Sequence, residues 1–127
     1  MLVPDIVIYY YARSTFWGFF LQNLKDGFWA TYPLTFTHSL FSFRHYIPGF
    51  AIVLFCVLSA YSFWSPFSLL LLLALIGLYV ALAFFVAISI AGRQRDARFF
   101  FIIPIVFFSR HVSYGVGSIA GLIKVLV

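Results

Sequence analysis

The sequence contains very few charged residues. Only 9% of its 127 residues are Asp, Glu, Lys or Arg, whereas soluble domains carry about 25%. Eight basic residues against three acidic ones give a formal net charge of +5. A nucleic-acid-binding domain has a similar positive balance, but it also needs a polar surface that this composition does not supply. The composition therefore excludes an ordinary soluble domain, and we expect no nucleic-acid partner.

Acidic residues are also too few for most catalytic chemistry. The only carboxylate side chains are Asp5, Asp26 and Asp96, and no two of them lie close in sequence. The sequence thus has no paired acid and base, no Asp-x-Asp motif for a metal–nucleotide complex and no Gly-rich phosphate loop. We predict that this chain alone carries no catalytic residues and no cofactor.

Cysteine and histidine are similarly scarce. Cys56 is the only cysteine, which excludes an internal disulfide, and we expect it to be a small buried apolar residue. His38, His45 and His111 do not have the spacing of metal ligands, and no cysteine or carboxylate accompanies them. We predict no metal site.

Hydrophobic residues take the place of charge, at 65% of the chain, with 23% aromatic. This predicts an all-α membrane protein in which an N-terminal amphipathic interface helix precedes three transmembrane helices. The spans are expected at 47–63, 67–91 and 99–122, close to the roughly 17–25 residues that a crossing requires. We expect a bend in the third span at Pro104. A β-rich run at 3–11 predicts a short strand, which needs a sheet from elsewhere to be stable.

Residues 14–30 have the periodicity of a helix that lies in the plane of the membrane surface. We expect Ser14 or Thr15 to cap its start and Gly27 to lie near its end. The apolar arc contains Phe16, Trp17, Phe20, Leu21, Leu24 and Phe28. The polar arc contains Ser14, Gly18, Gln22, Lys25, Asp26 and, as an exception, Trp29.

The basic residues predict the orientation of the spans. Arg13, Lys25 and Arg44 precede the first span, and Arg93, Arg95 and Arg98 follow the second, whereas the turn at 64–66 has no charge. The positive-inside rule therefore places the N-terminal portion and the linker at 92–98 in the cytoplasm.

The third apolar segment is interrupted by Arg110 and His111. An arginine in the middle of a span costs roughly 2.5–3.5 kcal/mol on insertion scales, so we expect it to face protein, water or a charged ligand. Arg110, Tyr114, Gly117 and Gly121 share one helix face, and His111, Gly115 and Ser118 share the next. Two interpretations remain open. The segment is either a packing seam, in which Ser113, Gly117 and Gly121 permit close helix contact, or an Arg–His site that contacts a lipid phosphate.

The order of these landmarks resembles that of a known family. They comprise Pro4, the Val-Ile-Tyr run, Arg13-Ser14, Gln22 and Gly27, then Ser-Phe-Arg-His-Tyr-Ile-Pro at 42–48 and His-Val-Ser-Tyr-Gly-Val-Gly-Ser at 111–118. The chain resembles the C-terminal membrane region of a family 2 glycosyltransferase, of the bacterial succinoglycan or exopolysaccharide type. Gln22 is not followed by the Arg-Trp of the processive relatives' Gln-x-x-Arg-Trp motif, which argues against processive polymerisation.

This resemblance implies a division of the chain and a role for its parts. Residues 1–13 would be the last strand of a catalytic domain that this chain lacks, 14–45 the interface helix with its connector, and 46–127 a three-helix anchor. The protein would lie in the bacterial inner membrane and contact membrane lipid, including polyprenyl phosphate or pyrophosphate. A divalent metal would belong to the missing domain. The expected contacts to acceptor or carrier lipid are Gln22, Lys25, Trp29, Arg44, His45, Arg110, His111 and Tyr114.

The alternative is a free-standing small membrane protein that packs helices or handles lipid. In that case the small residues Ser113, Gly117 and Gly121 would join copies of the chain into an oligomer.

Overall fold

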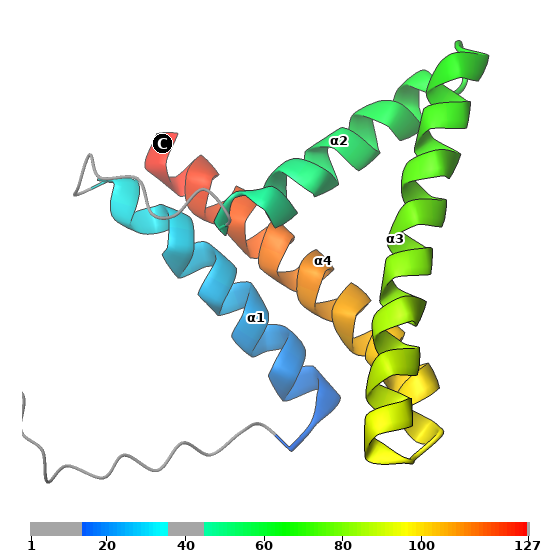
Figure 1. Ribbon diagram of the computed structural model, residues 1–127. Helices are drawn as coiled ribbons and strands as arrows, with labels where there is room; N and C mark the ends of the chain where they lie inside the picture. Colours follow the sequence, from blue (N-terminus) through cyan, green and yellow to red (C-terminus); the bar gives the residue numbers. More distant parts are fainter. Residues whose placement is uncertain (1–13, 36–44, 127) are drawn as a thin grey trace, which may run out of the picture.

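The computed structural model describes residues 14–35 and 45–126. All regular elements within these residues are helical (Figure 1), so the predicted helical class is confirmed. The strand predicted at 3–11 lies outside the described residues. In chain order, the elements are α1 (Phe16–Thr31), the short 3-10 helix η1 (Tyr32–Thr35), α2 (Ile47–Tyr61), α3 (Pro66–Gln94) and α4 (Arg98–Leu126).

Two of these helices, α3 and α4, are long and apolar enough to cross a membrane. Each has 29 residues, which corresponds to about 43 Å at 1.5 Å per residue. The third predicted span, α2, has only 15 residues, about 22 Å of helix, and is shorter than the roughly 30 Å hydrocarbon core. Length and composition thus support two of the three predicted spans.

Large apolar side chains face outward and small or polar ones face inward. Phe63 is 85% exposed and Phe67 is 74% exposed, whereas Thr31, Ser113 and Ser118 are almost completely buried. A soluble protein shows the reverse distribution. This distribution is typical of membrane helices, which contact each other through small residues and present large ones to hydrocarbon. Cys56, expected to be buried, is also exposed.

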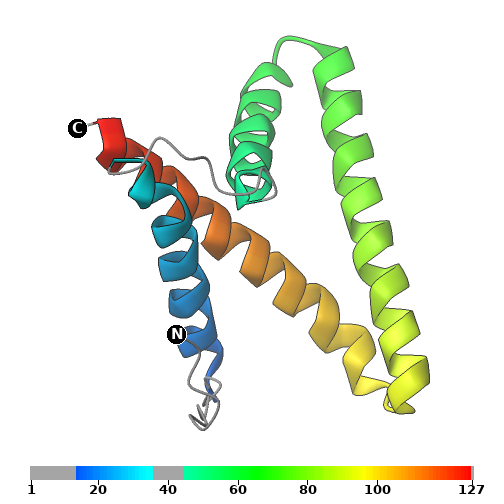
Figure 2. The ribbon, with the colours of Figure 1, turned by 60° about the vertical axis from the view of Figure 1, so that its left-hand side comes forward.

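The helices form two assemblies that share α4. Helices α2, α3 and α4 form the sides of a triangle, and α1 lies along the outer side of α4 (Figures 1 and 2). Helix α1 runs parallel to α4, because Leu24 lies against Gly117 and Thr31 against Gly121. The start of α2 also reaches the second half of α4, where Gly49 faces Ser118. This half of α4 is therefore held by both α1 and α2.

Local sequence explains where the helices begin and end. The Thr15 hydroxyl caps α1 by accepting a hydrogen bond from the Gly18 N–H, at 3.1 Å. Ser65 is the N-cap of α3, which begins with Pro66. Arg95 ends α3 in the left-handed conformation, with φ 53°, and the Asp96 side chain accepts from the Arg98 N–H at 2.9 Å where α4 starts.

The boundaries of α3 and α4 correct the predicted linker. The seven residues at 92–98 were expected to connect two spans, but α3 continues to Gln94 and α4 begins at Arg98, so only 95–97 lie between the helices. Helix α4 includes Pro104 and continues without interruption past Arg110 to Leu126. The polar residues thus interrupt the apolar sequence but not the helix.

Candidate functional site

Helices α1 and α4 meet along two stripes of small and polar residues. On α1 the buried residues are Asn23, Gly27 and Thr31, spaced four apart. The facing stripe of α4 has the same spacing and comprises Ser109, Ser113, Gly117 and Gly121. We call this contact the α1–α4 seam.

The backbones in this seam approach so closely that only glycine fits. A Cβ on Gly27 would overlap the carbonyl of Tyr114, and one on Gly117 would overlap the carbonyl of Leu24. The seam also contains a hydrogen bond, because the buried Thr31 hydroxyl donates to the Ser118 carbonyl at 3.0 Å. The small residues that we considered for joining copies of the chain therefore contact α1 of the same chain.

The seam leaves the apolar arc of α1 on the outside. This arc was predicted to face the membrane, and Phe16 and Trp17 are 56% and 65% exposed. The buried stripe instead contains Asn23, whose side-chain amide donates back to the Phe19 carbonyl at 2.8 Å. In a membrane this orientation has a physical reason, because large apolar residues gain nothing by leaving hydrocarbon, whereas small ones permit close packing.

Next to the seam, polar side chains from α1, α4 and the residue before the N-cap of α2 lie in the neighbourhood of the Tyr114 hydroxyl. The Tyr114 hydroxyl lies 2.8 Å from Nδ1 of His45, and the two rings stack. Asp26 and Arg110 both lie within electrostatic range of this hydroxyl. On α1, the Gln22 amide donates to the Asp26 carboxylate at 2.9 Å. We call these five residues the Tyr114 cluster.

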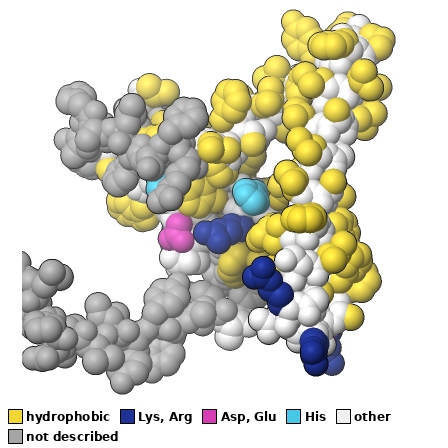
Figure 3. Space-filling view, viewed as in Figure 1, with side chains coloured by type: hydrophobic (Ala, Val, Ile, Leu, Met, Phe, Trp, Pro, Cys, Tyr) yellow, Lys and Arg dark blue, Asp and Glu magenta, His cyan; other side chains and the backbone are white. Residues whose placement is uncertain are grey.

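The Tyr114 cluster is a group of polar side chains on a molecule whose surface is mostly apolar. Figure 3 shows a basic and an acidic side chain adjoining each other over α1 and α4, with hydrophobic side chains above and to the right. The Tyr114 cluster contains both donors and acceptors. Arg110 offers N–H donors that suit phosphate, whereas Asp26 and Gln22 offer oxygens that accept from hydroxyl groups.

The Tyr46 hydroxyl has no hydrogen-bond partner within the described part of the chain. This oxygen is buried, and no hydrogen bond to it is made among residues 14–35 and 45–126. It also acts electrostatically on Tyr114, so it belongs to the same neighbourhood. An unsatisfied buried hydroxyl costs about 1–3 kcal/mol, which a hydrogen bond to a bound ligand would offset.

His111 lies at a separate place, next to α3. Its Nδ1 is 2.8 Å from the Phe107 carbonyl oxygen and 3.2 Å from the Tyr79 hydroxyl. A carbonyl only accepts hydrogen bonds, so Nδ1 carries the proton. His111 thus contacts α3, whereas the neighbouring Arg110 acts electrostatically on Tyr114.

The other predicted contact residues are not part of the cluster. Lys25 is exposed on α1. Trp29 is 58% exposed and packs edge-to-face on its own neighbours Phe28 and Tyr32, with ring centroids 5.6 and 5.4 Å away. Arg44 lies outside the described residues.

Three residues at these places were not predicted as contacts: Asp26, Tyr46 and Tyr79. The first had a signal in the sequence, because Gln22 and Asp26 are four apart on a helix and can pair. Tyr46 and Tyr79 had no such signal. Their relevance comes only from residues of α4, because Tyr46 acts electrostatically on Tyr114 and Tyr79 contacts His111.

Comparison of the chain with protein-family models, with curated proteins and with solved structures gives no match. Functional inference therefore depends on the seam, the Tyr114 cluster and the resemblance described above.

Proposed function

We propose that this chain is the membrane-anchoring part of a family 2 glycosyltransferase and that the Tyr114 cluster contacts the head of its lipid-linked acceptor. The observation that carries the proposal is that Arg110 and Asp26, the latter paired with Gln22, both act electrostatically on Tyr114 in an otherwise apolar chain. A phosphate-linked sugar needs cation donors for its phosphate and acceptors for its hydroxyl groups, and the cluster contains both.

The seam supports this proposal by fixing how the cluster is assembled. Gln22 and Asp26 belong to α1, whereas Arg110 and Tyr114 belong to α4, so the cluster exists only while the two helices are in contact. Glycines at 27 and 117 allow that contact. Helix α1 would thereby place a catalytic domain joined to its N-terminal side next to the acceptor.

The proposal also includes the orientation of the chain in the membrane. The basic residues Arg93, Arg95 and Arg98 would lie in the cytoplasm of a bacterial inner membrane, where nucleotide sugars are available. The catalytic residues and any divalent metal would be supplied by a domain encoded with this chain or by a partner.

The test is a transfer assay with the complete gene product in membrane vesicles, using a labelled nucleotide sugar and a polyprenyl-diphosphate-linked sugar as acceptor. Arg110→Gln is expected to raise the acceptor KM about tenfold or more, the change that corresponds to losing one charge-assisted hydrogen bond. Lys124→Gln, an exposed cation near the end of the same helix, serves as the matched control. Equal KM values for Arg110→Gln and Lys124→Gln would disprove the cluster's role.

A free-standing membrane protein is the alternative, and DNA sequence distinguishes the two. A reading frame that continues upstream of the Met1 codon into an α/β domain with an Asp-x-Asp motif supports the transferase anchor. A separate promoter and ribosome-binding site directly before Met1 supports the alternative.

A further inference from the structure

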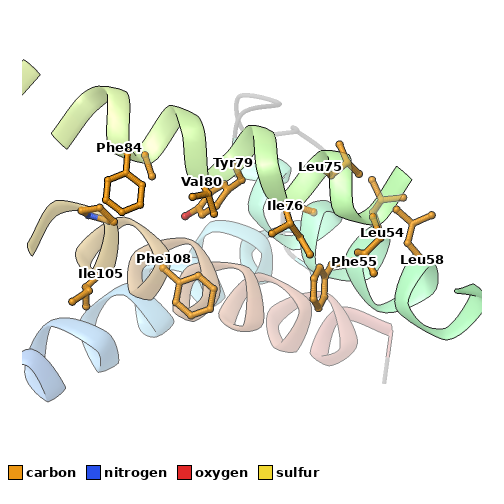
Figure 4. Close-up of a pocket in the computed structure, with 14 residues that line it drawn as sticks. Leu54, Phe55, Leu58, Leu75, Ile76, Tyr79, Val80, Phe84, Ile105 and Phe108 are labelled. Carbon is orange, nitrogen blue, oxygen red and sulfur yellow. The ribbon is translucent and has the colours of Figure 1, made fainter. Parts of the chain in front are cut away.

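The triangle of α2, α3 and α4 surrounds an apolar chamber, and its charged residues lie outside that chamber. The chamber has a volume of about 740 Å³, and Ile76, Phe55 and Phe108 point into it from α3, α2 and α4 (Figure 4). None of the lining side chains is charged. Phe84, which is part of the lining, packs on Phe100 with ring centroids 5.0 Å apart. This contact joins α3 to the first turn of α4.

The junction of α3 and α4 carries three arginines. Arg93, Arg95 and Arg98 are all exposed, and they place three of the chain's eight basic residues within six positions. Residues 46–92, by contrast, contain no Asp, Glu, Lys or Arg. Figure 3 shows basic side chains at this lower end of α3 and α4, with hydrophobic side chains above them. We call Arg93, Arg95 and Arg98 the arginine corner.

Hydrogen bonds hold the backbone of the arginine corner. The N–H groups of Arg95 and Asp96 both donate to the Ala91 carbonyl. The Asp96 carboxylate accepts from the backbone N–H of Arg98 at 2.9 Å. Arg95 has φ 53°, a left-handed conformation that glycine adopts most readily. The three side chains therefore extend from a fixed turn, and Arg95 occupies a position where glycine would fit the backbone better.

The positive charge of the corner is not neutralised within the described part of the chain. Among residues 14–35 and 45–126, none of the three guanidinium groups forms an ion pair. The carboxylate at the junction, Asp96, is used by the backbone N–H of Arg98. Each guanidinium presents N–H donors in a planar fork that matches the oxygens of a phosphate. The corner thus offers donors and charge to an anion from outside.

Exposed apolar side chains adjoin the corner on both helices. Ile88 on α3 and Phe101 on α4 lie within two turns of the nearest arginine and are 59% and 68% exposed. Both helices are long and apolar enough to cross a membrane, and in that case their shared end would lie near the headgroups. A phospholipid has the same order of groups, with a phosphate at the surface and hydrocarbon beneath it.

We propose that the arginine corner binds the headgroup of an anionic phospholipid, with its guanidinium groups donating to the phosphate and the adjoining apolar side chains contacting the acyl chains. Charge complementarity decides the class of lipid. A zwitterionic headgroup brings its own cation, whereas an anionic one carries a negative charge that the three arginines can neutralise. The inference goes beyond the proposed function, because this lipid is a constituent of the membrane and not the acceptor at the Tyr114 cluster.

The experiment measures lipid binding to the purified full chain in detergent by native mass spectrometry. The probes are dioleoyl phosphatidylglycerol, which is anionic, and dioleoyl phosphatidylcholine, which is zwitterionic. The unmodified chain is expected to bind phosphatidylglycerol about tenfold more tightly or better. Arg93→Gln/Arg98→Gln should lose this preference. Lys25→Gln/Lys124→Gln removes two exposed cations elsewhere and should keep it.

Arg95→Gly separates the charge of the corner from its backbone. Glycine accepts a φ of 53° without strain, so this variant should melt at the same temperature as the unmodified chain or higher. It should nevertheless bind phosphatidylglycerol about fivefold more weakly, because one cation is lost. Arg95→Lys keeps the charge but not the planar fork, and its affinity should lie between the two.

Three results would overturn the proposal. Equal binding of the two lipids would show contact without selectivity. An equal loss of preference in Arg93→Gln/Arg98→Gln and Lys25→Gln/Lys124→Gln would show dependence on net charge alone. Displacement of phosphatidylglycerol by ammonium phosphate, beyond that by ammonium acetate at the same ionic strength, would identify a site for free phosphate instead of a lipid.

Discussion

The two sides of α4 show two ways in which helices can meet. In the α1–α4 seam, glycine and serine bring the backbones together until no side chain fits between them. In the triangle of α2, α3 and α4, large side chains hold the helices apart around a chamber of about 740 Å³. Residue size therefore decides whether two helices pack closely or leave an open space between them.

Enlarging a glycine in the seam is expected to have the largest effect. Gly117→Leu would force α1 away from α4, and overpacking of this kind costs about 3 kcal/mol or more when backbone atoms are in the way. The expected result is a lower thermal midpoint in detergent and rapid trypsin cleavage at Lys25. Gly77→Leu is the control, since a Cβ there meets no atom within 4 Å. Equal stability of the two variants would mean that the seam is not tightly packed.

Removing the Thr31–Ser118 hydrogen bond tests whether it stabilises the α1–α4 seam beyond the close packing of the backbones. Thr31→Val keeps the shape of the side chain but loses the bond to the Ser118 carbonyl, a loss of about 0.5–1.5 kcal/mol. Thermal unfolding measures the change, and Thr31→Ser, which keeps the hydroxyl, should preserve more of the stability than Thr31→Val. The reverse order would show that the methyl group matters more.

The hydrogen bond between His45, just before α2, and Tyr114 on α4 should contribute less, because it is only partly buried. Tyr114→Phe removes the contact with His45 and is expected to cost about 0.5–1 kcal/mol. Under the proposed function it also weakens acceptor binding, measured as KM. Tyr61→Phe, at a residue that is 63% exposed, provides the baseline. A loss no greater than this baseline would remove Tyr114 from both roles.

Truncation in the chamber should have the smallest effect on stability. Ile76→Ala typically costs 2–5 kcal/mol in a close-packed core, but here it only enlarges an existing space, so we expect less than about 0.5 kcal/mol. Chemical denaturation in detergent provides the measurement. A cost above 2 kcal/mol would show that the chamber is packed rather than open.

Local features of the fold were predictable from sequence because they depend on neighbouring residues. The Thr15 cap, the start of α2 at Ile47 and the helical third segment agree with the structure. The end of α3 was misplaced, because a charged run was interpreted as a linker although Arg93 fits the last turn of a helix.

The contacts of the candidate site were harder to predict for two reasons. Helix periodicity identifies an apolar arc, but in a membrane that arc does not show which face packs against protein, so the stripe containing Asn23 on α1 was missed. The contacts also join distant positions: His45 and Tyr114 are 69 residues apart, and Tyr79 and His111 are 32 apart. No local pattern encodes such pairs.

The parallel pairing of α1 with α4 has a consequence for biosynthesis. Thr31 and its partner Ser118 are separated by 87 positions, and α4 is the last of the described helices to be synthesised. Helix α1 is therefore without its partner until the rest of the described chain has been made. Contacts between positions so far apart in sequence also form slowly. Docking of α1 onto α4 therefore follows the synthesis of α2 and α3, and it completes the Tyr114 cluster.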